Sequence, residues 1–541
     1  MNNSSRRGVG AGNQHVLDYL KRMRVESPGF YYAIEGGNES LNGNIFWADS
    51  TSRINYNYFG DTVRFDTSYR AGGYKVPFAT FTGVNHHAQP VLFGCALLNN
   101  ESEASLVWVL QTWLRAMHSK APVSITTDAD RLIQMVVTHV LSDTRHRFCR
   151  WSVFRQTKEN VAHTYQMHPS FDMELKKCVN DAESIEEFES CWELIMEKYY
   201  VTDNEWLQSM YSIRHQWVPV FMRDTFFGEL PTSDGDNVRN SYFDGFVDSS
   251  TTIQVWIKQY EKAMTNWHQR ELNADLDTSS STPLLKTPSP MEKQAANLFT
   301  RRIFLKFQEE LVETLANQVT KIDDSENIAT YRVAKFGEEH KAHTVRFNGF
   351  EMKSTCSCQM FEFSGLICRH TLSVFRAKNV LTLPSQYILN RWTRNAKNGD
   401  QGALEECPTL PTHSQVSTTF RYNNLRHEAM KFVEGGAKSV HMYNVAMNAL
   451  QDAVKKVSAT KKKNFGSVNG RLESGGRETQ AISQSKAEKE RKIRELKAEL
   501  DAVNHQSEVY RSNLLTVLKD MEDEKFKLSV KVQNARLSLK E

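Results

Sequence analysis

The sequence predicts an α/β protein of the α+β kind, in which a mixed sheet covered by helices is followed by a small metal-stabilised module and a C-terminal helix. Three observations lead to this prediction. Segments with strand-like apolar patterns between residues 61 and 99 precede two amphipathic helical segments and a further strand. Three cysteines and a histidine lie close together between Cys356 and His370. Apolar residues repeat at alternating steps of three and four between Ile493 and Met521.

Length and composition limit the possible classes of protein. With 541 residues, 40% of them apolar and 11% aromatic, the chain should form more than one domain with well-packed cores. Its net charge is only +3, so any surface that binds nucleic acid must be local. The first residues carry no apolar signal segment, and no apolar run is long enough to cross a bilayer. We therefore expect a reducing compartment, cytosol or nucleus, and no membrane partner.

The predicted sheet begins with three consecutive strands, which centre on Val63 to Phe65, Phe78 to Phe81 and Val91 to Phe93. A helix over Glu103–Met117, a strand over Val123–Asp128 and a helix over Leu132–Val140 follow. A further strand is predicted from Phe148 to Phe154. The tryptophan-rich stretch from Met173 to about Met222 has the pattern of an all-helical insertion. Together these elements predict a mixed sheet covered by helices.

Two aspartates occupy positions in this sheet where metal ligands are found in nucleases. Asp66 lies within a predicted strand and Asp128 at the end of another, so the sheet could bring their carboxylates side by side. Paired carboxylates of this kind hold magnesium ions in enzymes that transfer phosphoryl groups. Aspartates at strand ends are also common turn and capping residues. The pattern alone leaves both interpretations open.

The cysteine and histidine cluster has the spacing of a structural zinc site. Cys356, Cys358, Cys368 and His370 provide three thiolates and one imidazole, which are ligands that Zn²⁺ prefers. Four such ligands leave no open position for a catalytic water, so the site would stabilise a fold. The alternative is that the cysteines are small buried apolar residues beside an unrelated histidine.

The flanking residues predict how these ligands are presented. We expect a strand through Tyr331 and Phe336, and then a hairpin over residues 345–352 that turns at Asn348-Gly349. Cys356 and Cys358 would follow the hairpin, and Cys368 and His370 would enter a helix. Cys407 and His413 have no matching pair nearby and are interpreted as incidental.

The C-terminal third predicts association with another chain. The apolar repeat from Ile493 to Met521 has charged residues between its members, as in a coiled coil, although a solvated single helix remains possible. Before it, residues 453–485 are rich in lysine, glycine and serine, including Lys461-Lys-Lys463. We expect such a run to be disordered, and to be a solvated linker, a nuclear-import signal or a loose contact to phosphate. Residues 277–290, with serine and threonine followed by proline, form a second linker.

Five motifs of the chain stand out together: Asn44-Ile-Phe-Trp-Ala-Asp-Ser50, Phe59-Gly-Asp-Thr-Val-Arg-Phe-Asp-Thr67, Ile125-Thr-Thr-Asp128, Gln216-Trp-Val-Pro219, and Cys356-Ser-Cys-Gln-Met-Phe361 with Cys368-Arg-His370. These motifs resemble those of the plant far-red-impaired-response family, which is related to the far-red-elongated-hypocotyl proteins. The resemblance runs from about Val16 to about Asn390. Members of this family are transcription factors domesticated from Mutator-like transposases.

The resemblance implies a ribonuclease H-like transposase core with a helical insertion, a SWIM-type zinc finger and a nuclear location. The domain boundaries that we expect, in chain order, are a lead-in segment 1–45; a core 46–276 with its insertion at about 171–225; a linker 277–294; a helix and zinc finger 295–395 with its centre at 345–380; a helical and disordered basic linker 396–485; and a coiled coil 486–530.

The chain departs from the family pattern at three points. The parent transposases complete the two aspartates with a glutamate, but alignment places Asn237 at that position, and an amide adds no charge to a metal site. In Cys149-Arg-Trp-Ser152, Ser152 stands where a histidine is expected. No cysteine precedes Cys95, so the cysteine-rich DNA-recognition domain that begins most family members is not expected in this product.

These features together predict a nuclear transcriptional regulator rather than an enzyme. Asp66 and Asp128 would be vestigial, and the zinc ligands structural. The expected partners are related family members, as homodimer or heterodimer, and DNA, with no small-molecule substrate. The alternatives are an active DNA-cleaving transposase and a dimerisation partner without affinity for DNA.

Overall fold

The computed structural model describes residues 3–27, 29–36, 43–67, 78–100, 102–230, 242–248, 250–280, 283–325, 328–397, 429, 432 and 439–464. Residues up to 412 form one compact unit, and those from 413 onward form a second. In the second unit the described structure is the helix α17 (Val440–Asn464). The predicted coiled coil, Asn237, Cys407 and His413 lie outside the described residues.

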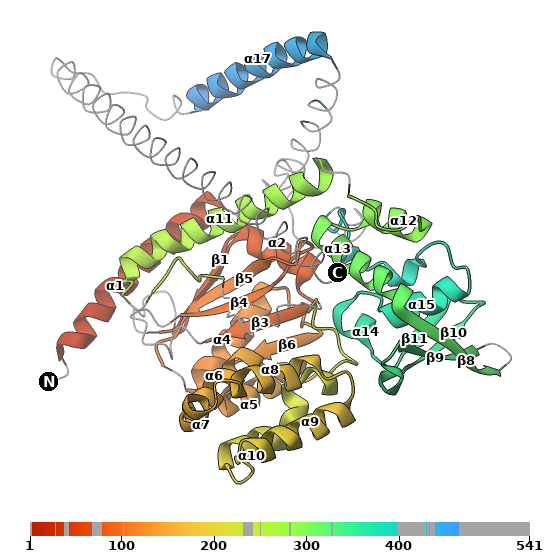
Figure 1. The fold of residues 1–541 in the computed structure, drawn as a ribbon. Coiled ribbons are helices and arrows are strands. Elements are labelled where there is room, and N and C mark those ends of the chain that lie inside the picture. Colours follow the sequence, from red (N-terminus) through yellow and green to blue (C-terminus); the bar gives the residue numbers. More distant parts are fainter. Residues whose placement is uncertain are drawn as a thin grey trace, which may run out of the picture. The chain divides into compact units, whose positions relative to one another are not determined.

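A seven-stranded mixed sheet forms the centre of the first unit (Figure 1). Its strands, in spatial order, are β1 (Tyr31–Ile34), β2 (Ile45–Ala48), β5 (Pro90–Leu97), β4 (Phe78–Val84), β3 (Thr62–Asp66), β6 (Ser124–Thr127) and β7 (Arg145–Phe148). The first five strands pair antiparallel, and β3, β6 and β7 pair in parallel. The three consecutive strands predicted from the sequence are confirmed as β3, β4 and β5. The edge strand β1 comes from the predicted lead-in segment 1–45.

The predicted strand from Phe148 to Phe154 is wrong for most of its length. β7 ends at Phe148, and the helix α6 (Arg150–Asn160) begins two residues later. Val153 and Phe154 are adjacent and both buried in the same apolar cluster as Phe148. A helix can bury two neighbouring side chains in one broad stripe, whereas a strand sends them to opposite faces. The pair therefore carried a helical pattern that was too short to recognise.

Alternating side chains of the central strands build a core on each face of the sheet. Phe46, Phe81 and Phe93 lie in one core together with residues of α2 (Ser50–Phe59), α4 (Glu103–Ala116) and α5 (Arg131–Val140). Trp47 and Leu92 lie in the other core, which α1 (Asn3–Glu26) and α11 (Ile253–Ser280) complete. Figure 1 shows α11 running beside α1 across the sheet. The helices predicted at Glu103–Met117 and Leu132–Val140 are confirmed.

A layer of short helices follows the last strand and contains the predicted tryptophan-rich insertion. It consists of α6, α7 (Ala162–Met167), α8 (Phe171–Asp181), α9 (Ile185–Lys198), α10 (Glu205–Ser212) and the 3-10 turns Arg214–Gln216 and Pro219–Phe221. Trp192 and Trp217 are buried in its core. The insertion is helical as predicted, and helices already begin at Arg150.

A second, antiparallel sheet carries the metal-binding motif. Its order is β11 (Lys353–Cys356), β10 (His343–Asn348), β9 (Ile328–Lys335) and β8 (Asn317–Ser325). Five helices surround it or lead into it, and several 3-10 turns connect these elements. The helices are α12 (Pro290–Leu298), α13 (Arg301–Glu313), α14 (Met360–Ser364) and α15 (Arg369–Ala377), preceded by α11. The 3-10 turns are Thr314–Ala316, Glu339–Lys341, Ser385–Tyr387 and Asn390–Trp392.

The predicted hairpin exists, but its turn differs from the prediction. Asn348 pairs with Lys353, so the connection spans four residues instead of turning at Asn348-Gly349. The side chain of Asn348 accepts hydrogen bonds from the backbone N–H groups of Phe350 and Glu351 at 3.0 and 3.1 Å, which closes the longer loop. Phe350 is consequently 95% exposed instead of lying in a strand. Phe336, predicted in the preceding strand, lies one residue beyond β9 and is exposed.

The second sheet and its helices pack directly against the central sheet. Arg391 is 5% exposed at its side chain, forms an ion pair with Asp61, and donates a hydrogen bond to the carbonyl of Val84 at 2.7 Å. The backbone N–H of Phe227 donates to the carbonyl of Phe363 at 3.0 Å. A helix sufficiently long and apolar to span a bilayer is not found among the described residues.

Candidate functional site

Cys356, Cys358, Cys368 and His370 come together at one end of the second sheet. Cys356 is the last residue of β11, Cys358 follows it in a turn, and Cys368 precedes α15, whose second residue is His370. The four ligand atoms all lie within 4.8 Å of one another, and the three cysteines are buried. The Sγ of Cys356 lies 3.7 Å from the Nδ1 of His370. All four residues predicted as zinc ligands are therefore neighbours in space.

The donor set and its dimensions fit Zn²⁺. In a tetrahedral site with zinc–sulfur bonds of about 2.3 Å and zinc–nitrogen bonds of about 2.0–2.1 Å, sulfur and nitrogen lie about 3.6 Å apart. The observed separation of 3.7 Å agrees with this value. The hydrogen bonds from Cys356 and Cys358 hold the pKa of the Cys368 thiol well below its usual range, so one thiolate is already favoured. Zn²⁺ would bind these four residues and link the hairpin to α15.

A buried carboxylate orients the helix that carries two of the ligands. Arg369, between Cys368 and His370, donates from Nη2 to Oε1 of Glu310 on α13 at 2.6 Å and from Nε to Oε2 at 3.0 Å. The backbone N–H of Arg369 also donates to Oε2 of Glu310 at 2.8 Å. A carboxylate at a helix N-terminus accepts from unpaired N–H groups and is favoured by the helix dipole. Glu310 thus fixes the start of α15, and with it the positions of Cys368 and His370.

The site also contacts the helical layer of the first sheet. The ring of His343, 4.1 Å from that of His370, lies with its Nε2 3.3 Å from a carboxylate oxygen of Glu183. Lys341 and Glu187 form an ion pair at 2.6 Å. The hydrogen bond to His343 lowers the pKa of Glu183 to about 2, against the opposing effect of burial. The loop before α9 and the first turn of α9 therefore contact residues beside the cysteine and histidine cluster.

Replacing Glu183 by glutamine is expected to lower the free energy of unfolding at pH 7 by about 1 kcal/mol or less. The side chain is 48% exposed, so solvent weakens its interaction with His343. Because the pKa of Glu183 is lowered in the folded state, its contribution is present above the ordinary carboxyl pKa and is lost as the pH falls towards 2. Urea unfolding of Glu183→Gln and of the exposed control Glu197→Gln would measure the difference. Equal midpoints for the two variants would contradict it.

Asp66 and Asp128 also lie together, at the carboxyl ends of the parallel neighbours β3 and β6. Phe65 is opposite Thr127 in the register, so the two aspartates follow on adjacent strands. They are 2% and 9% exposed. The backbone N–H and the hydroxyl of Thr67 donate to Oδ2 of Asp128 at 3.2 and 3.1 Å. The two aspartates therefore lie at the ends of neighbouring strands, close enough for the charge of Asp66 to act on Asp128.

Two buried carboxylates this close together are more stable when they bind one proton or one cation, which reduces the repulsion between their negative charges. Burial and the negative charge of Asp66 raise the pKa of Asp128 to about 6. Among the described residues, no third histidine, cysteine, aspartate or glutamate joins the two within ligand distance. Asn237, which the alignment puts at the third position, lies outside those residues. Ser152, where a histidine was expected, is buried and its hydroxyl accepts from the N–H of Ala129 at 3.2 Å.

A cavity of about 190 Å³ adjoins the same face of these two strands and is rich in arginine. Arg64, two residues before Asp66 on β3, lines it together with Arg147 and Arg150. Arg147 and Arg150 both pair with Glu229, whose pKa is held at about 2 because the two guanidinium charges outweigh the effect of burial. Three arginines and one carboxylate line the cavity, so its net charge is positive.

The sequence alone did not identify Glu310, His343 or Glu229 as neighbours of these sites. Glu310 lies among buried residues of α13 that include Phe307 and Leu311. A carboxylate within an apolar helical stripe is a recognisable indication of a buried partner. The identity of that partner depends on how α13 packs against α15, which no local pattern specifies.

Two protein-family models match parts of the chain. The MULE transposase domain matches residues 62–156, which include Asp66 and Asp128. The SWIM zinc finger matches residues 343–379, which include all four predicted zinc ligands.

Curated relatives resemble the chain over 82 to 100% of its length. Protein FAR1-RELATED SEQUENCE 9 of Arabidopsis thaliana is 56% identical over 537 residues, which cover 98% of this chain and 97% of that protein. Protein FAR1-RELATED SEQUENCE 5 of the same plant is 48% identical, with 100% of this chain and 70% of the relative covered. Protein FAR-RED IMPAIRED RESPONSE 1 is 38% identical over 82% of this chain and 53% of its own length.

Proposed function

Because the chain belongs to the plant family of FAR1-related sequence proteins, we propose that it is a nuclear regulator of transcription built on a transposase-derived core that no longer cleaves DNA. It acts through protein contacts and through local contacts to DNA. The observation that carries this proposal is the combination of a complete zinc-binding set with a core in which two acidic residues, Asp66 and Asp128, are paired.

The strand order supports a ribonuclease H-like core. Three antiparallel strands, β5, β4 and β3, are followed in the sheet by two strands parallel to β3. This arrangement brings the ends of β3 and β6 side by side, which is where a ribonuclease H-like enzyme would hold its metal ions. The core is proposed to be catalytically silent because Asn237 replaces the third acid, and a neutral amide holds divalent ions less strongly than a carboxylate.

Contacts to DNA are proposed to involve the arginine-lined cavity beside β3 and β6. Its guanidinium groups can neutralise phosphates, although the net charge of the whole chain is only +3. Association with related family members is proposed to use the predicted coiled coil at residues 486–530. Nuclear location is proposed on the basis of the lysine run at 461–463 and the family membership.

Gel-shift measurements across salt concentrations test the DNA contacts. We expect the binding constant to fall steeply as salt rises, with a slope of about −0.9 in the log–log plot for each phosphate contacted. Arg64→Gln should reduce that slope by about 1, whereas Arg24→Gln, on α1 and not in the lining of the cavity, should not change it. Absence of binding at every salt concentration would favour a dimerisation partner without affinity for DNA.

An active DNA-cleaving enzyme is the second candidate, and the proximity of Asp66 and Asp128 favours it. Purified protein incubated with Mg²⁺ or Mn²⁺ and transposon-end DNA separates the two candidates. The proposed regulator leaves the DNA intact. Cleavage that is abolished by Asp66→Ala would establish the enzyme instead.

A further inference from the structure

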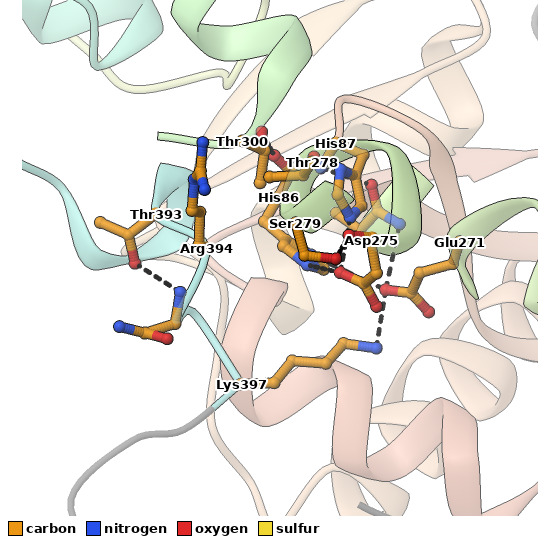
Figure 2. Close-up of polar contacts among 12 residues, drawn as sticks. His86, His87, Glu271, Asp275, Thr278, Ser279, Thr300, Thr393, Arg394 and Lys397 are labelled. Carbon is orange, nitrogen blue, oxygen red and sulfur yellow. Dashed lines mark hydrogen bonds and ion pairs between the residues drawn. The ribbon is translucent and has the colours of Figure 1, made fainter. Parts of the chain in front are cut away.

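Two adjacent histidines in the loop between β4 and β5 point towards one aspartate of α11. The Nε2 of His86 lies 3.2 Å, and the Nε2 of His87 2.9 Å, from Oδ1 of Asp275. Figure 2 shows the two rings and this carboxylate gathered at one point, with Glu271 one helical turn away. The three ligand atoms all lie within 4.8 Å of one another. The two parts of the chain are nearly 190 residues apart in sequence.

The loop is built to hold both histidines on the same side. The side chain of Asn85 accepts hydrogen bonds from the backbone N–H groups of His87 and Gln89, at 2.9 and 3.0 Å. Ala88 adopts a positive φ of 54°, a conformation that residues with a Cβ adopt only at some energetic cost. The backbone carbonyl of His86 accepts from the hydroxyl of Thr300 at 2.6 Å. These contacts fix a conformation in which neighbouring side chains converge instead of alternating.

Burying these polar side chains lowers the stability of the fold unless each polar atom has a hydrogen-bond or metal partner. His86 and His87 are 2% and 3% exposed. The ring of His86 stacks on Phe59 with its centroid 5.6 Å away. Its Nδ1 makes no hydrogen bond and lies 3.7 Å from Oε1 of Glu271. Glu271 in turn pairs with Lys397 at 2.7 Å (Figure 2).

We propose that His86, His87 and Asp275 form a second metal site, separate from the SWIM cysteines, for a divalent transition ion such as Zn²⁺. Two imidazoles and one carboxylate are a donor set that zinc and its neighbours in the first transition series accept. Ligand atoms on a tetrahedral ion lie about 3.4 Å apart for bonds of about 2.0–2.2 Å. The observed 2.9 and 3.2 Å require an outward adjustment of only a few tenths of an ångström.

Glu271 has the position of the carboxylate that commonly orients a metal-bound histidine. A ligating imidazole usually donates its second N–H to such a group, which fixes the ring and strengthens the ligand. The Nδ1 of His86 faces Glu271 at 3.7 Å, and a small shift towards the carboxylate would complete that hydrogen bond. Without an ion, two buried rings share a single carboxylate oxygen and the Nδ1 of His86 remains unsatisfied.

A metal at this position would connect three parts of the fold. The histidines belong to the β4–β5 loop, and Asp275 and Glu271 belong to α11. Lys397 extends the network to the segment that follows the zinc module. An ion that binds only the folded state would therefore stabilise the packing of α11 on the sheet.

Metal counting on the full chain tests the site. After equilibration with Zn²⁺ and removal of loosely bound metal, we expect two ions for each chain, falling to one in His87→Ala and to one in Cys358→Ser. Asp275→Asn keeps a hydrogen-bond acceptor for both rings but removes the charge, so it should also bind one ion while remaining folded. His139→Ala and Asp277→Asn, at exposed positions, are the matched controls and should bind two.

Cobalt substitution distinguishes the two sites by their colour. Co²⁺ at the cysteines produces intense thiolate charge-transfer bands, whereas Co²⁺ bound by histidine and aspartate produces only weaker d–d bands. Asp275→Asn should lose the second set and retain the first. A single ion in the wild-type chain, or two ions in folded Asp275→Asn and His87→Ala, would overturn the proposal and leave the cluster as a hydrogen-bonded structural contact.

Discussion

Cys358→Ser is expected to abolish zinc binding at the SWIM motif and to unfold the second sheet with α15. Structural zinc contributes about 10 kcal/mol or more to the folding of small zinc modules, which is comparable with the whole stability of a domain of about 5–15 kcal/mol. Serine offers no thiolate, and the three remaining ligands would have to hold the ion in a buried pocket. The cluster joins β11 to α15, so losing the ion separates the hairpin from the helix.

Native-state hydrogen exchange would locate the effect. Protection should disappear across β9, β10, β11 and α15, which together contribute about a third of the buried residues of one apolar core, and persist in β3 to β6. Cys191→Ser, a cysteine of α9 outside the cluster, is the matched control and should retain both metal and protection. Natively purified protein that contains no zinc, yet protects these strands, would contradict the structural role assigned to the ion.

Asp128→Asn is expected to stabilise the protein at pH 7, by up to about 3 kcal/mol. Burial and the charge of Asp66 raise the pKa of Asp128 to about 6, and the difference from an ordinary carboxyl corresponds to this energy. A raised carboxyl pKa means that the folded state holds a proton that the unfolded chain releases between about pH 4 and pH 6. The wild-type protein therefore loses stability as the pH rises through this interval, and asparagine removes that loss.

Urea unfolding in magnesium-free buffer, with zinc retained, measures this effect. The advantage of Asp128→Asn should be full above pH 6 and small near pH 4. Asp130→Asn is a close control, because Asp130 caps α5 from an exposed position and asparagine caps equally well. A wild type that is the more stable protein at pH 7 would contradict the prediction, because the two buried charges would then not lower the free energy of unfolding.

The cluster of three cysteines and one histidine could be predicted from the sequence because residue type and spacing encode a metal-binding set. Cys356, Cys358, Cys368 and His370 needed no long-range information. The strands β3 to β6 were predictable for the similar reason that alternating side chains lie on opposite faces. The turn at Asn348 was predicted wrongly because an asparagine side chain can close either a two-residue or a longer loop, and only the register of β10 and β11 decides between them.

The carboxylate pair was predictable to a smaller extent. The predicted strands placed Asp66 and Asp128 near strand ends. The structure shows that the parallel pairing of β3 with β6 brings the two residues together. Their electrostatics depend on burial and on Arg64, which the sequence does not reveal. The cluster of His86, His87 and Asp275 was not predicted, since its members join only when α11 crosses the sheet. Two consecutive histidines in a loop were its only local indication.

The buried contact of Arg391 with Asp61 and Val84 has a consequence for engineering this chain. The guanidinium group lies close to the end of the zinc module, yet both of its partners belong to the first hundred residues. A chimaera that transplants residues 295–395 alone would leave this cation without its carboxylate, and a truncation before residue 391 would leave Asp61 without its ion-pair partner. A chimaera made from this chain and a relative should therefore take residues 1–397 from one parent as a single segment.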